Sequence, residues 1–144
     1  MASRKLPCAC TTLRKASRAV ARAYEERLAQ AGVTATQFAI LRAIVRLGGM
    51  VPLTALADDL VLERTSLYRA VGPLRRHHLV RLTASADRRI KRIALTRAGR
   101  ARLREATPLW EAAQAQFVRS FGAAQWADLA RDLFGIVAIT RSVN

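Results

Sequence analysis

The sequence predicts a mainly α-helical chain with one small β-hairpin, and three observations support this. Glycine (7) and proline (4) are scarce among the 144 residues, which favours helices. Apolar residues recur at spacings of three and four over most of the chain, as on one face of a helix. Residues 79–83 and 90–95 instead alternate apolar and polar side chains, which is typical of strands. The length suits one domain, or one small domain with an assembly element.

Charge is the second strong signal in the sequence. The chain has 25 Lys and Arg against 10 Asp and Glu, a formal net charge of +15. This imbalance predicts a polyanionic partner, most often nucleic acid and less often an acidic membrane surface. Hydrophobic residues make up 51% of the chain, so it is not a disordered basic tail. No apolar run is long enough for a membrane span or a secretory signal, so we expect a cytoplasmic protein.

Four helices are expected before the hairpin. Residues 1–10 lack periodicity and are predicted to form a mobile N-terminal arm. The second helix has a capping-box pattern, with Thr34 followed three residues later by Gln37. Met50 and Val51 suit a short extended segment, and Pro52 suits the first position of a helix. From these signals, the four helices cover about residues 11–31, 34–47, 52–60 and 63–77.

The hairpin and the helices after it follow from turn and capping residues. Strands at 79–83 and 90–95 are joined by a loop that carries Asp87, Arg88 and Arg89. Thr96 is expected to cap a long fifth helix, which Pro108 either kinks or divides. A break near Gly122 then leads into a final helix over residues 123–140.

The order helix, turn, helix, strand, loop, strand is that of a winged helix-turn-helix. The helix at 52–60 would brace the helix at 63–77, whose first side chains would enter a major groove of DNA. The exposed polar side chains predicted to serve the major groove are Arg64, Thr65, Ser66, Tyr68 and Arg69. Those predicted to hold backbone phosphates are Arg75, Arg76, Arg81, Arg88 and Lys91.

The predicted loop between the strands would supply a minor-groove contact. An arginine at a projecting tip, here Arg88 or Arg89, suits the narrower groove, where the potential is more negative. A single arginine of this set fits an ordinary solvated face equally well. The whole set, on one helix face and one loop tip, is much more specific to DNA binding.

Several short segments of the chain, in their order and spacing, resemble the MarR family (multiple-antibiotic-resistance regulators). These are winged-helix transcription factors that act as dimers. The resemblance covers about residues 11–142. The segments that carry it are Gly32-Val33-Thr34 with Gln37-Phe38, Leu56-Ala57, Arg64-Thr65-Ser66-Leu67 with Arg69, Leu79-Val80-Arg81, Asp87-Arg88-Arg89, and Leu95-Thr96-Arg97-Ala98-Gly99.

This resemblance implies an assembly and a mode of DNA reading. Residues 11–31 and 104–144 of two chains would interleave into a helical dimerisation region, and residues 32–103 would form the DNA-binding domain. Two recognition helices would read a pseudo-palindromic operator on double-stranded DNA. Asp87 would orient Arg89 for the minor groove.

The resemblance also implies a small-molecule effector, often a phenol or another aromatic acid. It would bind where the dimerisation region meets the winged helix and would weaken DNA binding. An arginine such as Arg18 or Arg42 would suit a carboxylate there. The candidate residues near this junction are Ser17, Arg18, Phe38, Leu41, Arg42, Met50 and Trp110. At helical spacing, however, aromatic residues are more often part of a core.

Two positions depart from the family pattern. His78 stands where the family has glycine at the end of the recognition helix, and histidine tolerates a left-handed conformation better than most residues. Glu63 stands where a short capping aspartate is common. Glutamate caps less well, although its charge suits a helix N-terminus.

Cys8 and Cys10 lie two residues apart in the predicted arm, and three interpretations are open. As a metal site, the pair lacks further ligands at a convincing spacing. As a redox switch, Cys10 falls where organic-hydroperoxide sensors of the MarR family keep a reactive cysteine, and nearby cations would lower its pKa. Those sensors surround the cysteine with tyrosine hydroxyls, where this chain has Ala35 and Phe38. The third interpretation is two ordinary thiols.

The sequence contains no arrangement typical of an enzyme. We find no nucleophile with a base and an orienting group, no glycine-rich phosphate loop and no zinc-protease motif. We therefore expect no enzymatic activity, no cofactor and no metal site. The function expected is a homodimeric, sequence-specific transcriptional repressor released by a small effector. The alternatives are a redox-sensing regulator that uses Cys10 and a basic protein that binds nucleic acid without sequence preference.

Overall fold

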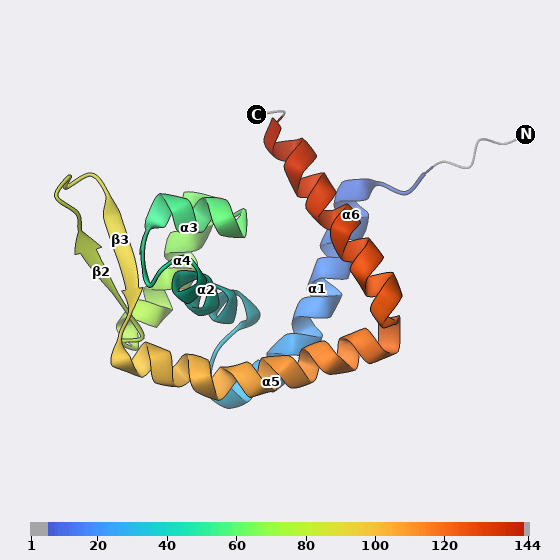
Figure 1. The fold of residues 1–144 in the computed structure, drawn as a ribbon, viewed down its shortest axis with the longest axis horizontal. Helices are drawn as coiled ribbons and strands as arrows, with labels where there is room; N and C mark the ends of the chain where they lie inside the picture. The colour runs from blue at the N-terminus through green and yellow to red at the C-terminus, as the bar shows by residue number, and fades with distance from the viewer. Residues whose placement is uncertain (1–5, 143–144) are drawn as a thin grey trace, which may run out of the picture. The chain divides into compact units, whose positions relative to one another are not determined.

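A computed structural model describes residues 6–142, and it is mainly α-helical with one small sheet (Figure 1). The predicted fold class is confirmed. Along the chain the elements are α1 (Ala9–Leu28), the 3-10 helix η1 (Ala29–Ala31), α2 (Ala35–Arg46), β1 (Met50–Pro52), α3 (Leu53–Leu60), α4 (Arg64–Arg76), β2 (Val80–Ala84), β3 (Lys91–Leu95), α5 (Arg97–Phe121) and α6 (Ala123–Ser142).

The chain forms two compact units, one up to Trp110 and the other from Glu111 onward, and α5 runs from the first into the second. The first unit holds the winged helix-turn-helix together with α1. The second holds the end of α5 and all of α6. The expected division into a dimerisation region and a DNA-binding domain concerns two chains, so it stays a prediction.

The core of the first unit is apolar and receives side chains from most of its helices and strands. Apolar side chains at helical spacing in α2 and α4 meet those of α3, β3 and the end of α1, and each fully buried leucine or isoleucine contributes about 1.5–3 kcal/mol. In the described part of the chain, no polar or charged residue is buried. The largest fully buried side chains are Leu28, Ile40, Leu41, Ile44, Leu56, Leu67, Leu74, Ile93 and Val71.

The sheet has one more strand than the predicted hairpin. Strand order is β1-β3-β2 and all pairs are antiparallel, so the extended segment expected at Met50 and Val51 joins β3 as an edge strand. Its register places Val51 opposite Ile93, with Leu82 of β2 on the other side of Ile93. A three-residue strand has no local signal for its partner, because the pairing joins residues about forty positions apart along the chain.

Capping interactions place the helix starts. The capping box of α2 is confirmed: the Gln37 amide donates to the Thr34 hydroxyl (3.1 Å), and the Thr34 amide donates to the Gln37 side chain (3.0 Å). Helix α1 begins at Ala9, two residues before the predicted start, with Cys8 at its N-cap. Cys10 therefore lies in a helix, which corrects the expected arm of residues 1–10, of which residues 1–5 lie outside the described range.

Proline residues interrupt neither long helix. Pro108 lies inside the single helix α5, so the alternative of a division there is wrong. Pro73 lies inside α4. Pro108 is exposed, so water can bond to the carbonyl group that a proline leaves without its helical donor.

The base of the β2–β3 hairpin is joined to the start of α5. The Thr96 hydroxyl accepts a hydrogen bond from the Gly99 amide (3.0 Å), which confirms the predicted cap, and donates to the carbonyl oxygen of His78 (2.6 Å). The Thr96 amide donates to the carbonyl oxygen of Leu79 (3.1 Å). A Cβ at position 99 would overlap that same carbonyl, so only glycine fits. His78 adopts the left-handed conformation (φ 55°) that the family pattern assigns to glycine.

The second unit is held by aromatic contacts. Phe117 stacks on Phe121 with ring centres 5.7 Å apart, and Trp126 meets Phe117 edge-on at 5.1 Å. Gly122 (φ 104°) makes the break between α5 and α6, as the sequence predicts.

Within residues 6–142, no single helix is long and apolar enough to cross a bilayer; only residues 9–31 and 35–46 taken together, bent by 75°, reach that length and composition.

Candidate nucleic-acid interface

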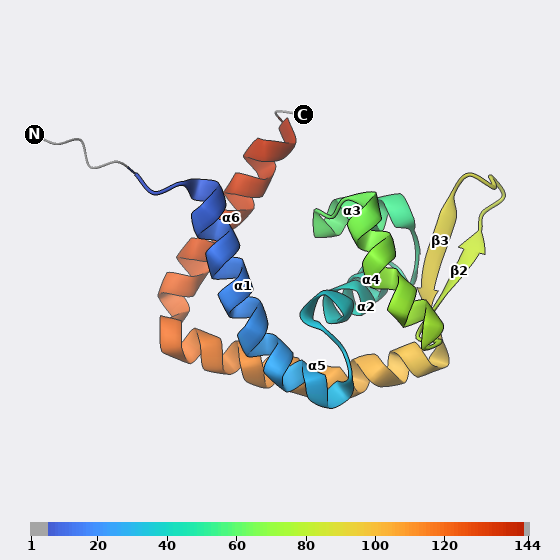
Figure 2. The same ribbon diagram turned by 180° about the vertical axis from the view of Figure 1, so that it is seen from behind.

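Helix α4 presents a polar face at its N-terminal half. Its apolar side chains Leu67, Val71 and Leu74 are buried in the core, so the opposite face is open to solvent. The exposed polar side chains of the first two turns are those predicted for the major groove, Arg64, Thr65, Ser66, Tyr68 and Arg69. Figure 2 shows α4 passing α2 and ending at the base of the hairpin, so both support this helix. Its N-cap, Glu63, makes no capping hydrogen bond through its side chain.

A tight turn sets the direction in which α4 leaves α3. Val61 adopts a left-handed conformation (φ 52°), and the Leu62 amide donates to the Ala57 carbonyl (2.9 Å), so α3 ends and the chain turns sharply before α4. A β-branched residue in this conformation is strained, and the Val61 side chain is 60% exposed. The turn therefore costs free energy, which the buried contacts of α3 and α4 offset.

The tip of the hairpin is a closed turn that carries two arginines. The Ser85 amide donates to the Ile90 carbonyl (3.0 Å), and the Asp87 carboxylate accepts the Arg89 amide (3.1 Å). Asp87 thus acts on the main chain of Arg89 and positions the residue without bonding its guanidinium. Among the described residues, neither Arg88 nor Arg89 has an ion-pair partner.

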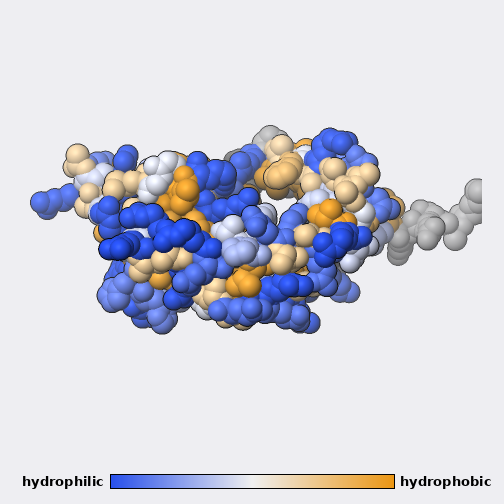
Figure 3. Space-filling model, turned by 60° about the horizontal axis from the view of Figure 1, so that its bottom comes forward, coloured by the Kyte–Doolittle hydropathy of each residue, from blue (hydrophilic) through white to orange (hydrophobic). Residues whose placement is uncertain are grey.

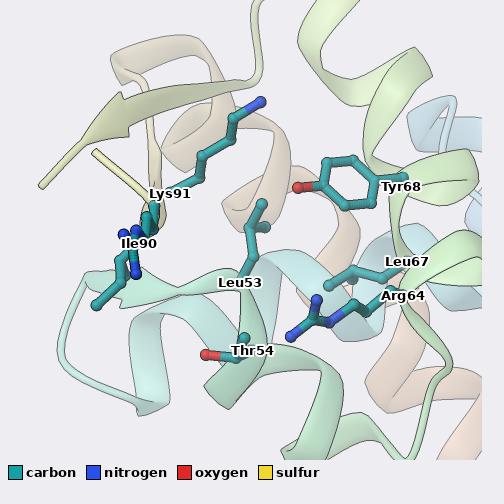
Figure 4. Close-up of a pocket in the computed structure, with 8 residues that line it drawn as sticks. Leu53, Thr54, Arg64, Leu67, Tyr68, Ile90 and Lys91 are labelled. Carbon is teal, nitrogen blue, oxygen red and sulfur yellow. The ribbon is translucent and has the colours of Figure 1, made fainter. Parts of the chain in front are cut away.

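The β2–β3 hairpin is the wing of the winged helix. Helix α4 and the wing enclose a hollow of about 160 Å³, shown in Figure 4. It brings together four predicted DNA contacts, Arg64 and Tyr68 of α4 with Arg89 and Lys91 of the wing. The other side chains that line it are Leu53, Thr54, Leu67 and Ile90. Sequence reasoning missed Thr54, because it assigned α3 only a bracing role.

The remaining predicted phosphate contacts lie elsewhere. Arg75 and Arg76 occupy the last turn of α4, where the helix dipole favours cations. Arg81 pairs with Ala94, whereas Lys91 pairs with Ala84. Because side chains alternate along a strand, Arg81 lies on the opposite face of the sheet from Lys91, together with Arg92. The structure therefore does not bring Arg81 to the hollow. The face of the molecule in Figure 3 is mostly hydrophilic, with scattered apolar patches.

A second hollow in the first unit has an aromatic and cationic lining. It measures about 250 Å³ and includes three predicted effector residues, Phe38, Arg42 and Trp110. Phe38 stacks on Trp110 with ring centres 5.8 Å apart, and the Arg42 guanidinium lies 4.1 Å from the Trp110 ring centre, a cation–π contact. We refer to this as the aromatic hollow. Its other lining residues are Tyr24, Leu28, Ala35, Ala39, Ala43, Arg46 and Leu60.

Two titratable side chains of the aromatic hollow are perturbed. Burial raises the pKa of the Tyr24 phenol above its usual value. A hydrogen bond and the charge of Asp59 raise the pKa of Arg46. Arg46 was not predicted from the sequence, because only the packing of α3 on α2 places it here.

The other predicted effector residues lie outside the aromatic hollow. Ser17 and Arg18 line a separate surface depression along α1. Leu41 is fully buried in the core, and Met50 lies on β1 opposite Ala94.

Both cysteines are exposed and free. The backbone amide and the hydroxyl of the nearby Thr11 lower the pKa of the Cys8 thiol. Among the residues that the structure covers, no group of three or more His, Cys, Asp or Glu side chains could hold a metal ion.

The helix-turn-helix, the cationic α4 face and the wing define a winged-helix DNA-binding protein. The family described as "Winged helix DNA-binding domain" matches residues 33–99. The crystal structure of the M. tuberculosis transcriptional regulator MosR in complex with DNA is similar, with 38% sequence identity over 96% of this chain and 99% of that chain, and a TM-score of 0.87. A second MosR crystal structure has 38% identity over 94% of this chain and 96% of that one (TM-score 0.82).

More distant relatives share the fold. A mutant MarR from E. coli, in complex with operator DNA, has 21% identity over 88% of this chain and 91% of that chain, with a TM-score of 0.77. No curated protein sequence matches this chain. The chain belongs to the MarR family of winged-helix, DNA-binding transcriptional regulators.

Proposed function

We propose that the chain is a homodimeric repressor that binds a pseudo-palindromic operator and releases it when a small aromatic acid or phenol binds. It would act in the cytoplasm, where the operator lies. The observation that carries the proposal is the pairing of the exposed polar face of α4 with a wing tip whose two arginines have no acidic partner among the described residues.

The predicted DNA contacts divide into residues that contact base edges and residues that bind backbone phosphates. The polar face of α4 would read base edges in the major groove, and Arg89 would enter the minor groove. Exposed cations around them, above all Lys91 and the Arg75-Arg76 pair, would hold phosphates. Arg81, on the other sheet face, would reach phosphates only along a different part of the duplex.

Selection from random duplexes tests this reading mode. Sites enriched by the full chain should share an inverted repeat, with binding to them far tighter than to random duplex at one salt concentration. Binding should also weaken steeply as salt rises. An affinity ratio near one would instead favour the non-specific basic protein.

Exposed apolar side chains on α6 support a second copy of the chain as partner. Phe134 is 76% exposed and Ile139 is 65% exposed, and Leu129 and Ile136 are also open in the single chain. A Phe134→Asp variant should sediment as a monomer with its helices intact, whereas Asp132→Asn should remain dimeric. A wild-type chain that sediments as a monomer would contradict this part of the proposal.

The chemistry of the aromatic hollow supports an aromatic acid as effector. Trp110 and Phe38 offer flat apolar surface, and the Arg42 guanidinium can pair with a carboxylate. Benzoate should quench Trp110 fluorescence in a Trp126→Phe background, which leaves one tryptophan, and should release bound duplex. Arg42→Gln should weaken binding of benzoate but not of benzyl alcohol, its neutral counterpart. Equal losses for both probes would remove Arg42 from this role.

A thiol-based redox response is the second candidate, favoured by the lowered pKa of Cys8 and the exposure of both thiols. Peroxide should then release DNA from the wild type but not from Cys10→Ser or Cys8→Ser. Equal release from wild type and variants would reject it.

A further inference from the structure

The hollow between α4 and the wing is lined by apolar, cationic and hydroxyl side chains and by no acidic one. Its floor is apolar, because Leu53 and Leu67 are buried there. Every polar group on its walls is a cation or a hydroxyl, from Arg64, Arg89, Lys91, Thr54 and Tyr68. Guanidinium and ammonium groups are positively charged and only donate, and the two hydroxyl groups can donate as well. The lining therefore suits a negatively charged acceptor.

The position of the hollow also indicates what would enter it. If α4 lies in a major groove and Arg89 reaches the adjacent minor groove, one sugar–phosphate strand must cross between them, because that strand separates the two grooves. The hollow lies between these two elements. Figure 4 shows the Tyr68 hydroxyl extending from α4 into this space, with Thr54 on α3 and Lys91 on the wing at its edges.

We propose that this hollow holds one backbone phosphate of the duplex, and that the Thr54 hydroxyl of α3 is a positioning donor to it. The proposal rests on the proposed function, since the duplex is its ligand. Lys91 and Arg64 neutralise the phosphate, and Thr54 and Tyr68 donate hydroxyl hydrogen bonds to its oxygens. Arg64 and Tyr68 then serve this phosphate instead of base edges, which are left to Thr65, Ser66 and Arg69. One phosphate then touches α3, α4 and the wing together, which sets the depth of α4 in the groove.

The volume agrees with such an occupant. About 160 Å³ is many times the roughly 10–15 Å³ that admits one water, so a phosphate group can enter the hollow. Thr54 is exposed and Leu53, its neighbour, is buried, so the first turn of α3 is held in place while the hydroxyl stays accessible.

The test compares two isosteric substitutions in the full chain. Thr54→Val removes the hydroxyl at the hollow, and Thr83→Val removes one on the opposite face of the sheet from Lys91. With a duplex selected by the wild type, Thr54→Val should bind about tenfold more weakly, with an unchanged slope of affinity against salt because no charge is lost. Thr54→Ser should restore binding, and Thr83→Val should bind as the wild type.

A neutral phosphate locates the contact on the DNA. Replacing single phosphates by methylphosphonate should weaken wild-type binding sharply at one position of each half-site. On the duplex modified at that position, Thr54→Val should bind almost as tightly as the wild type binds it, because the two changes remove the same interaction. Lys91→Met should show the same non-additivity and a salt slope lower by about one.

The remaining outcomes separate the two proposals. The proposed phosphate site is overturned, while specific DNA binding stands, if Thr54→Val binds with wild-type affinity. It is also overturned if the losses of affinity from Thr54→Val and from methylphosphonate are additive at every phosphate. Binding of inorganic phosphate next to Thr54, without any methylphosphonate effect, assigns the hollow to a free anion and also overturns it. Failure of the wild type to bind any duplex overturns both the proposed phosphate site and the proposed function.

Discussion

The two ends of the β2–β3 hairpin are built in opposite ways. At the base, backbone groups of His78 and Leu79 bond to Thr96, and Gly99 lies against the Leu79 carbonyl with no room for a side chain. At the tip, mostly exposed residues form a turn that is closed by the hydrogen bond from the Arg89 amide to the Asp87 carboxylate. The base supplies stability and the tip supplies charge, so substitutions at the two ends should affect different measurements.

The largest effect is expected at the base. Gly99→Ala should lower the free energy of unfolding by about 3 kcal/mol, because the new methyl group would overlap the Leu79 carbonyl. Urea unfolding measures this. Gly135→Ala in α6 is the matched control, since nothing lies within 4 Å of its Cβ and helix propensity favours alanine there. Equal stability of both variants would contradict the close packing at the base.

The next effect belongs to the tip and concerns binding alone. Arg89→Ala should cost about 1–3 kcal/mol of DNA-binding free energy and alter sequence preference, with the free energy of unfolding unchanged. Lys91→Ala should instead weaken binding to all sequences similarly. If Arg89→Ala weakens binding to selected and to random duplexes by the same factor, the minor-groove role of Arg89 is excluded.

A smaller change in stability is expected from the cap at the base. Thr96→Val should lower the free energy of unfolding by about 1 kcal/mol, because the Gly99 amide loses its acceptor and the His78 carbonyl loses a donor. Thr96→Ser keeps the hydroxyl and should stay close to the wild type in thermal unfolding. The opposite ranking of these two variants would show that the methyl group matters more than the cap.

The smallest effect should be a gain. His78 holds a left-handed conformation, so His78→Gly should raise the free energy of unfolding by about 0.5 kcal/mol, after the extra freedom of glycine in the unfolded chain is counted. His77, one residue earlier, has φ −87°, and His77→Gly should lower it. A loss from both changes would mean that the His78 side chain makes a contact worth more than its backbone strain.

Local features of the fold could be predicted from the sequence because their causes lie within a few residues. The capping box of Thr34 and Gln37 and the cap at Thr96 involve neighbours three positions apart, and both are present. The start of α1 was misplaced by two residues, since Cys8 at the N-cap carries no capping side-chain bond that a pattern could signal.

The residues of the candidate site show the same distinction between local causes and tertiary packing. The cations of α4 and the wing tip stand in contiguous segments, so the sequence alone indicates them. Thr54 was missed because its importance depends on the distance between α3 and the wing. The aromatic hollow likewise includes Arg46, which the sequence does not indicate, and leaves out Ser17, because the packing of separate helices decides which side chains line the same hollow.

By itself the sequence determined the order of the elements, their caps and the presence of an arginine-bearing turn, because periodicity and turn chemistry act over short stretches. Only the tertiary structure decided that β1 pairs with β3, that Arg81 and Lys91 lie on opposite sheet faces, and that Gly99 must lack a side chain. These features depend on strand register and on the approach of distant backbone segments, which no local pattern encodes.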